Sequence, residues 1–121
     1  MAISGTPVEG NYAAINVGVG APADNTAAVV TIPAVAAKRT VIRSIDASYT
    51  LTGALPALAS IAVTFGGVTK WAMGLKLVQA VYHWDFPWGL YNKDAVNEEV
   101  VVTLGDPGVA NVTGILSVVY E

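Results

Sequence analysis

His83 is the only histidine in the 121-residue sequence, and Asp85 follows two positions later. Residues two apart share a face of an extended strand, so the imidazole and the carboxylate would lie side by side. Such a pair can act as a general base. Nucleophilic catalysis needs a third group, and the sequence has no G-x-S-x-G motif. We therefore interpret His83 as part of a polar strand face or a subunit contact, and we predict no catalytic residues and no enzymatic activity.

The sequence also predicts no metal site and no cofactor. One histidine and no cysteine exclude the common zinc sites. The acidic residues form no calcium-binding loop of the D-x-[DN]-x-[DN]-G type. Gly18 and Gly20 lack the third glycine of a dinucleotide-binding loop, so we expect a turn there. The adjacent Glu98 and Glu99 predict a solvated entrance to a strand.

An aromatic cluster is the strongest candidate for ligand or partner binding. Its members lie within a short stretch and include all three tryptophans: Trp71, Tyr82, Trp84, Phe86, Trp88 and Tyr91. Exposed tryptophan and tyrosine rings can stack on sugars, or they can anchor a protein interface. Tyr82, Trp84 and Phe86 alternate along one predicted strand face, which favours packing in the core.

The segment from Phe86 to Tyr91 is expected to be a loop. For Trp88, Leu90 and Tyr91, contact with a partner and burial in the core both remain open interpretations.

The segment Leu51 to Leu58 is unusual for a connection between strands, because it contains Leu51, Leu55 and Leu58 and no charge. Loops in solvent are normally polar, so we expect it to dock on a neighbour or to fold over an end of the domain. The candidate interface residues are therefore Trp71, Trp88, Leu90, Tyr91, Leu51, Leu55 and Leu58.

The composition favours a surface that is partly covered by partners. Charged residues make up 12% of the chain, against about 25% in an ordinary soluble domain. The net charge is −3, and Lys38, Arg39 and Arg43 are the only local basic group, which argues against nucleic acid as a partner. We predict no membrane span, because no apolar stretch reaches about 18 residues. We also predict no signal peptide.

Short runs of valine, isoleucine, threonine and tyrosine between glycine, proline and asparagine turns predict strands. The expected strands are Tyr12–Val19, Ala27–Ile32, Arg39–Thr50, Ala59–Phe65, Val68–Met73, Leu77–Phe86, Glu98–Leu104 and Val112–Tyr120. Gly66 and Gly67 predict a tight hairpin, since both can adopt positive φ. We expect an all-β, antiparallel two-sheet β-sandwich that is jelly-roll-like, ahead of an immunoglobulin-like one, which would show a Cys…Trp…Cys pattern.

Alternation predicts which face of each strand is buried. Ile61 and its alternate neighbours are expected in the core. In the strand Arg39–Thr50, Val41 and Ile45 are expected on the apolar face, and Ile42 on the polar face. We expect a single domain over residues 12–121, preceded by an irregular N-terminal arm at 1–11.

The segment Ile32 to Tyr49 joins a Pro-Ala-rich connector, a basic pair and a long strand. It is followed by Ile61 to Gly67, the valine-rich strand Glu98 to Leu104, and the closing segment Gly114 to Tyr120. In this order, over about residues 28–121, the chain resembles small β-sandwich virion proteins of tailed bacteriophages.

The resemblance implies a jelly-roll capsid decoration (cement) protein. Such a protein would be a homotrimer that stabilises the head non-covalently by bridging copies of the major capsid protein. It would be made in the host cytoplasm, lie on the capsid surface of the virion, and have no catalytic residues. The alternative is a carbohydrate-binding or receptor-binding β-sandwich module of a phage tail or fibre.

Overall fold

The computed structural model describes residues 16–20, 22–24, 26–51, 58–76, 81–106 and 112–121. These residues form strands and turns and no helix, so the all-β prediction is confirmed. The predicted N-terminal arm, residues 1–11, lies outside them. Within this part of the chain, nothing has the helical length and hydropathy needed to cross a membrane.

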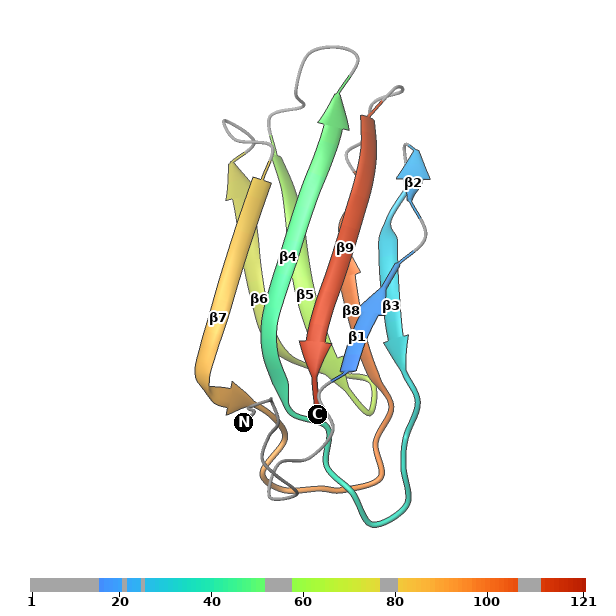
Figure 1. Cartoon of the computed structure of the whole chain (residues 1–121), viewed down its shortest axis with the longest axis vertical. Helices are drawn as coiled ribbons and strands as arrows, with labels where there is room; N and C mark the ends of the chain where they lie inside the picture. Colours follow the sequence, from blue (N-terminus) through green and yellow to red (C-terminus); the bar gives the residue numbers. More distant parts are fainter. Residues whose placement is uncertain (1–15, 21, 25, 52–57, 77–80, 107–111) are drawn as a thin grey trace, which may run out of the picture.

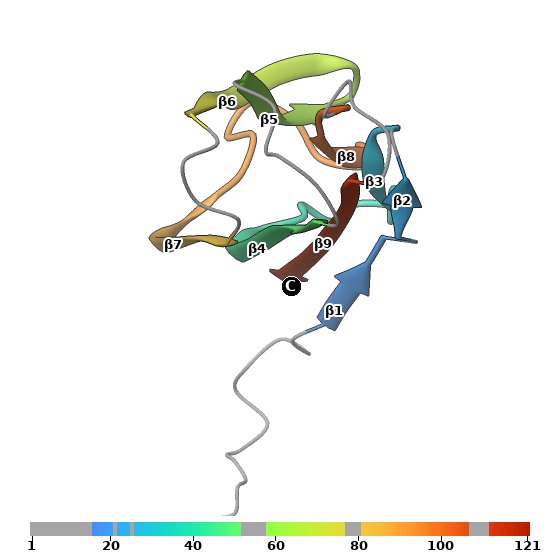
Figure 2. The ribbon, with the colours of Figure 1, turned by 90° about the horizontal axis from the view of Figure 1, so that it is seen from above.

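The described residues contain nine strands that form two antiparallel sheets. The strands are β1 (Asn16–Val19), β2 (Ala23–Asp24), β3 (Ala28–Ile32), β4 (Ile42–Leu51), β5 (Leu58–Phe65), β6 (Val68–Lys76), β7 (Val81–Leu90), β8 (Val100–Leu104) and β9 (Val112–Tyr120). One sheet has the order β1-β9-β4-β7, with β2 also paired to β9, and the other has the order β3-β8-β5-β6. Figures 1 and 2 show the two sheets packed face to face.

The strand order is that of a jelly roll. The chain forms one long hairpin whose tip is β5 and β6 and whose successive pairs are β4 with β7, β3 with β8, and β1 with β9. Rolling this hairpin brings β4 against β9 and β5 against β8, which closes the two sheets. The predicted jelly-roll-like sandwich is therefore confirmed.

The core lies between the sheets and is filled by alternate residues, as strand periodicity requires. Its largest fully buried side chains include Phe65, Ile42, Ile45, Ile61, Leu104 and Leu116. The tip hairpin turns at Gly66 and Gly67, whose φ angles are 57° and 85°, so the predicted tight turn is confirmed.

The prediction that Ile42 faces the polar side was wrong, because Ile42 is fully buried. The register of β4 against both neighbours shifts between Ile42 and Ser44. The extra residue, Arg43, forms a β-bulge that reverses the alternation for the residues before it. Sequence periodicity assumes an unbroken ladder and therefore misplaces the residues on one side of a bulge.

The expected loop from Phe86 to Tyr91 was also wrong, since β7 continues to Leu90. Against β4, the paired residues step from Asp85 to Leu90 while β4 advances from Ser44 only to Ile42. Phe86 to Gly89 are therefore skipped in this register and form a bulge in β7. β7 is an edge strand, and a bulge and a proline are common at sheet edges.

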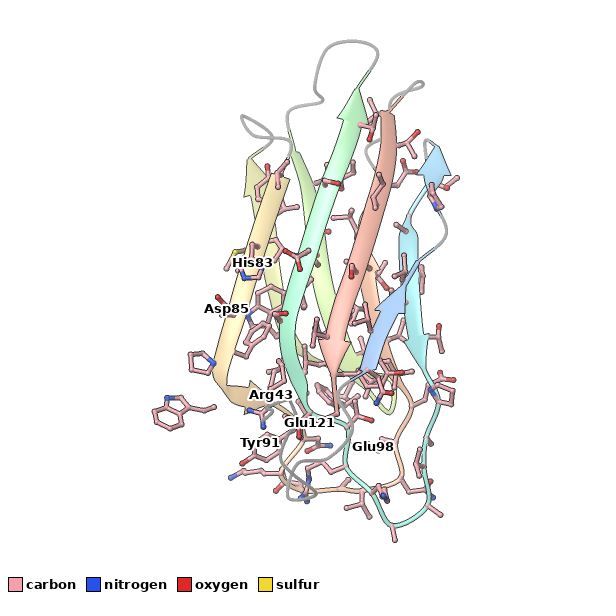
Figure 3. The ribbon with its side chains drawn as sticks, viewed as in Figure 1. Arg43, His83, Asp85, Tyr91, Glu98 and Glu121 are labelled. Carbon is pink, nitrogen blue, oxygen red and sulfur yellow. The ribbon has the colours of Figure 1, made fainter. Side chains whose placement is uncertain are left out.

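Loop charges gather at the end of the sandwich drawn lowest in Figure 1, which we call the lower end. It is where β3, β7 and β9 end and β4 and β8 begin, and where the labelled Arg43, Tyr91, Glu98 and Glu121 lie in Figure 3. The charged residues in these connections and at the adjoining strand ends are Lys38, Arg39, Arg43, Lys93, Asp94, Glu98, Glu99 and Glu121. They comprise as many basic as acidic residues, so this end is polar but close to neutral.

Candidate interaction surface

A sandwich has two open sides, where the edge strands of its two sheets face each other. The β6/β7 side lies between edge strands β6 and β7. Trp71 of β6 makes edge-to-face contacts with Trp84 (ring centroids 5.5 Å apart) and Phe86 (5.4 Å) of β7. Tyr82 stacks on Trp84, with ring centroids 5.8 Å apart. These partly buried rings pack against the core, so the predicted inward orientation of Tyr82, Trp84 and Phe86 is confirmed.

Trp88 differs from the other aromatic residues because its side chain is 91% exposed. It lies at the bulge of β7, followed by Gly89 with a φ of 77°. A side chain at position 89 would collide with Val41 of the neighbouring segment. Gly89 thus lets the bulge lie close against the sheet while Trp88 points away from it.

The other candidate interface residues have mixed positions. Leu90 is partly buried against the core, and Tyr91 is 45% exposed, with the guanidinium of Arg39 5.7 Å from its ring centroid. Leu51 ends β4 and Leu58 begins β5, but their side chains are not among those described, and Leu55 lies outside the described residues.

The opposite open side, the β1/β3 side, also exposes large apolar residues. Val17 and Val19 on β1 are 61% and 67% exposed, and Val29 on β3 is 42% exposed. At the lower end of this side is a solvent-open hollow of about 490 Å³. Its apolar walls include Ile32, Val35 and Tyr120, and its polar lining includes Arg39 and Glu121.

Hydrogen bonds fix the loops of the lower end. Arg39 donates from Nε to the carbonyl of Asn92 (2.7 Å) and from a terminal nitrogen to that of Lys93 (3.1 Å). The buried Asn92 donates from Nδ2 to Glu98 Oε1 (2.6 Å). Glu98 is therefore a half-buried acceptor rather than a residue of a solvated strand entrance, and β8 begins only at Val100.

A histidine with two carboxylates lies on the outer face of the β1-β9-β4-β7 sheet. His83 Nδ1 is 2.5 Å from Asp46 Oδ1 on β4, and Nε2 is 3.0 Å from Asp85 Oδ1 on β7. Figure 3 shows His83 and Asp85 along β7. Only the protonated imidazolium can donate from both nitrogens. The hydrogen bond to Asp46, followed by that to Asp85, raises the pKa of His83 above its ordinary value.

This arrangement can hold a proton and link two strands. The structure confirms the predicted pairing of His83 with Asp85. The contact of His83 with Asp46 was not predicted. Asp46 is 37 residues from His83 in sequence, and only the pairing of β4 with β7 brings the two together. Alternation could place Asp46 on a polar face but could not identify the neighbouring strand.

The described side chains on the outer face of the β3-β8-β5-β6 sheet are mostly small and uncharged. Its outward positions are Val29, Thr31, Ser60, Ala62, Thr64, Thr69, Ala72, Gly74, Val101 and Thr103. In these four strands, among the side chains that the structure describes, the one charged residue is Lys70, at the register shift of edge strand β6.

No group of three or more histidine, cysteine, aspartate or glutamate side chains that could hold a metal ion occurs in the part of the chain described here. What this part does offer is surfaces: an uncharged sheet face, two open sides with exposed apolar residues, and one hollow. Comparisons of the chain with protein-family models, with curated proteins and with solved structures found no match.

Proposed function

We propose that this chain is a capsid decoration (cement) protein of a tailed bacteriophage that acts as a homotrimer and stabilises the head by bridging major capsid proteins. The jelly roll alone does not select this function, because the same fold serves unrelated activities. The observation that carries the proposal is the scarcity of charge among the described side chains on the outer face of the β3-β8-β5-β6 sheet.

An uncharged face of small side chains is suited to permanent contact with a large protein surface. Covering it removes no described charge from water except at Lys70, so it avoids most of the desolvation cost of burying ions. Residues such as Ala62 and Gly74 allow close approach of another backbone, and the threonine hydroxyls can form hydrogen bonds to it. A specific contact needs roughly 800 Å² from each partner.

Sedimentation with capsids tests the proposal. Heads assembled from the major capsid protein of the virus whose genome encodes this chain should carry the purified chain into the pellet, saturably. Ala62→Glu, at the middle of the uncharged face, should weaken binding at least tenfold. Ser48→Glu, on the outer face of the other sheet, is the matched control and should bind like wild type. A chain that stays in the supernatant at saturating head concentration would contradict the proposal.

A second candidate function is a carbohydrate-binding module of a tail or fibre, and the exposure of Trp88 favours it. A solvent-exposed indole can stack on a sugar ring. Binding on a glycan array that is lost in Trp88→Ala and kept in Ala62→Glu would support this candidate over decoration.

A further inference from the structure

In the described part of the chain, exposed apolar residues gather on the edge strands that border the two open sides. Most of the large apolar side chains that are more than 40% exposed belong to these strands or to the loop after β3. Bordering the β6/β7 side are Val68, Met73, Val81 and Trp88, and bordering the β1/β3 side are Val17, Val19, Val29 and Val35. A monomer in water gains nothing from two separate apolar sides, whereas a chain of contacts between copies covers both.

The two sides also differ in shape in a complementary way. The β6/β7 side has a projection, because Trp88 stands out from the bulge of β7. The β1/β3 side has the hollow of about 490 Å³, which is mostly apolar and large enough for an indole. Trp88 lies near the end of β7, and the hollow is lined by Ile32 at the end of β3 and Tyr120 at the end of β9. The projection and the hollow are therefore both at the lower end.

The lining of the hollow suits an aromatic side chain. Ile32, Pro33 and Val35 supply apolar contacts, and Lys38 and Arg39 bring cations that can interact with an indole face. Arg39 is held in place by its bonds to the carbonyls of Asn92 and Lys93, so this cation is positioned before any partner arrives.

We propose that Trp88 of one copy inserts into the hollow beside Ile32 and Val35 of the next copy, so that copies associate head to tail, with the β6/β7 side of one against the β1/β3 side of its neighbour. The two surfaces in this contact are different, so it is heterologous, and a suitable rotation between copies closes it into a ring. The inference rests on the self-association included in the proposed function and specifies the contact, not the number of copies.

The available area is adequate for such a contact. β7 has ten residues, so its side of the sandwich is roughly 33 Å long. Two sheets about 10 Å apart with their outer side chains make that side about 20 Å wide. The product is about 660 Å², which is of the same order as the roughly 800 Å² that each partner gives to a stable interface. Tryptophan is among the residues most often found to dominate the binding energy of such an interface.

Two complementary variants test the head-to-tail contact. Trp88→Ala removes the projection and keeps the hollow, whereas Val35→Trp fills the hollow from its exposed wall and keeps the projection. Each variant alone should have the mass of a 12.5 kDa monomer in light scattering, at concentrations where wild type is oligomeric. An equimolar mixture should form a dimer and nothing larger, since it contains one working projection and one working hollow. Ile115→Ala, which truncates an exposed apolar residue of the inner strand β9 away from both sides, should associate like wild type.

The alternatives give different results. Association of Val35→Trp alone would mean that Trp88 meets Trp88 across a two-fold axis, and a mixture that stays monomeric would mean that the projection does not bind the hollow. Either result would overturn the head-to-tail contact. Trp88→Ala with wild-type mass, or a wild-type monomer at all concentrations, would overturn it as well. If the variants unfold at the same temperature as wild type, at dilutions where wild type is monomeric, misfolding is excluded as the cause of lost association. Head sedimentation of the same samples separates the two proposals. A monomeric chain that binds heads contradicts this contact and the homotrimer but leaves head binding intact, whereas an oligomer that ignores heads contradicts only decoration.

Discussion

The imidazole Nδ1 of His83 lies 2.5 Å from Oδ1 of Asp46, which links the edge strand β7 to its neighbour β4. Both residues are exposed, and the carboxylate of Asp85 lies 3.0 Å from the other ring nitrogen. The arginine of β4, Arg43, is paired with Glu121. The ring is therefore surrounded by negative charge, and its protonated form is the one that the surface favours.

The raised pKa of His83 predicts a pH dependence with a defined sign. A base whose pKa is raised on folding contributes stability that is fully present below its unfolded value of about 6.5. This contribution is lost as the pH rises through the folded pKa. An NMR titration of the imidazole should show a pKa above 6.5, and Asp46→Asn should lower it more than Asp85→Asn, because the bond to Asp46 is the larger cause. A wild-type pKa at or below 6.5 would contradict the hydrogen-bond arrangement.

Tyr49 connects the two sheets and gives a second pH prediction. Its buried hydroxyl donates to the carbonyl of Gly105 (2.8 Å), and burial, with smaller effects of Tyr82 and Asp106, raises its pKa to about 12. Above pH 10 the unfolded chain loses this proton while the folded chain keeps it, so stability falls as the pH rises from 10 to 12. The fall is at most about 1.4 kcal/mol per pH unit.

Tyr49→Phe should reduce this alkaline loss in urea titrations and cost about 1–2 kcal/mol at neutral pH, since the carbonyl of Gly105 loses its donor. The matched control is Tyr91→Phe on the half-exposed Tyr91, which should change the neutral-pH value by less than about 0.5 kcal/mol. Equal effects of the two substitutions would show that the inter-sheet bond contributes nothing.

Truncation of Trp71 and truncation of Trp88 should change the free energy of unfolding by different amounts. Trp71 contacts Trp84 and Phe86 and packs against the core, so Trp71→Ala should reduce the free energy of unfolding by about 3 kcal/mol. Trp88 is almost fully exposed in one copy, so Trp88→Ala should change it by less than about 0.5 kcal/mol in dilute, monomeric samples. Chemical unfolding followed by circular dichroism measures both, and a large loss for Trp88→Ala would place its indole in the core of the single chain.

Alanine substitutions at three glycines distinguish the stability cost of backbone strain from that of steric collision. Gly89 has positive φ and a side chain there would meet Val41, Gly67 has positive φ with open space around it, and Gly74 has open space without positive φ. Alanine should cost at least about 2 kcal/mol at 89, about 1 kcal/mol at 67 and less than 0.5 kcal/mol at 74. Thermal unfolding of the three variants gives the order, and an undisturbed Gly89→Ala protein would mean that the bulge presenting Trp88 can be rearranged cheaply.

The sequence was sufficient for the fold class because jelly-roll strands alternate strictly over most of their length. Ile61 is buried where alternation places it, and β9 has the predicted bounds, Val112–Tyr120. The errors fall at irregularities of the ladder. Alternation ignores the bulge at Arg43, so it predicted the wrong face for Ile42. The bulge of β7 around Pro87 led to the prediction of a loop where the strand continues.

The candidate surfaces were predictable only in part. The concentration of tryptophans identified the region of Trp88, but its exposure depends on the bulge and on Gly89. The hollow joins Asn16, Ile32 and Tyr120 from three different strands, and the partner of His83 is on a fourth. Contacts between strands distant in sequence follow from the sheet order, which local patterns do not encode.

The position of β9 within its sheet has a consequence for how the protein is made. β9 is the last of the described strands to leave the ribosome, yet it lies between β1 and β4 and separates them. Until it emerges, β1 has no partner in that sheet and β4 has only β7, so this sheet must be completed after most of the chain has been translated. The tip hairpin of β5 and β6 can pair far earlier, because two residues connect its strands. Nascent chains arrested before residue 112 should therefore expose β4 along one free edge, and this interval of synthesis is when the protein is most in need of a chaperone.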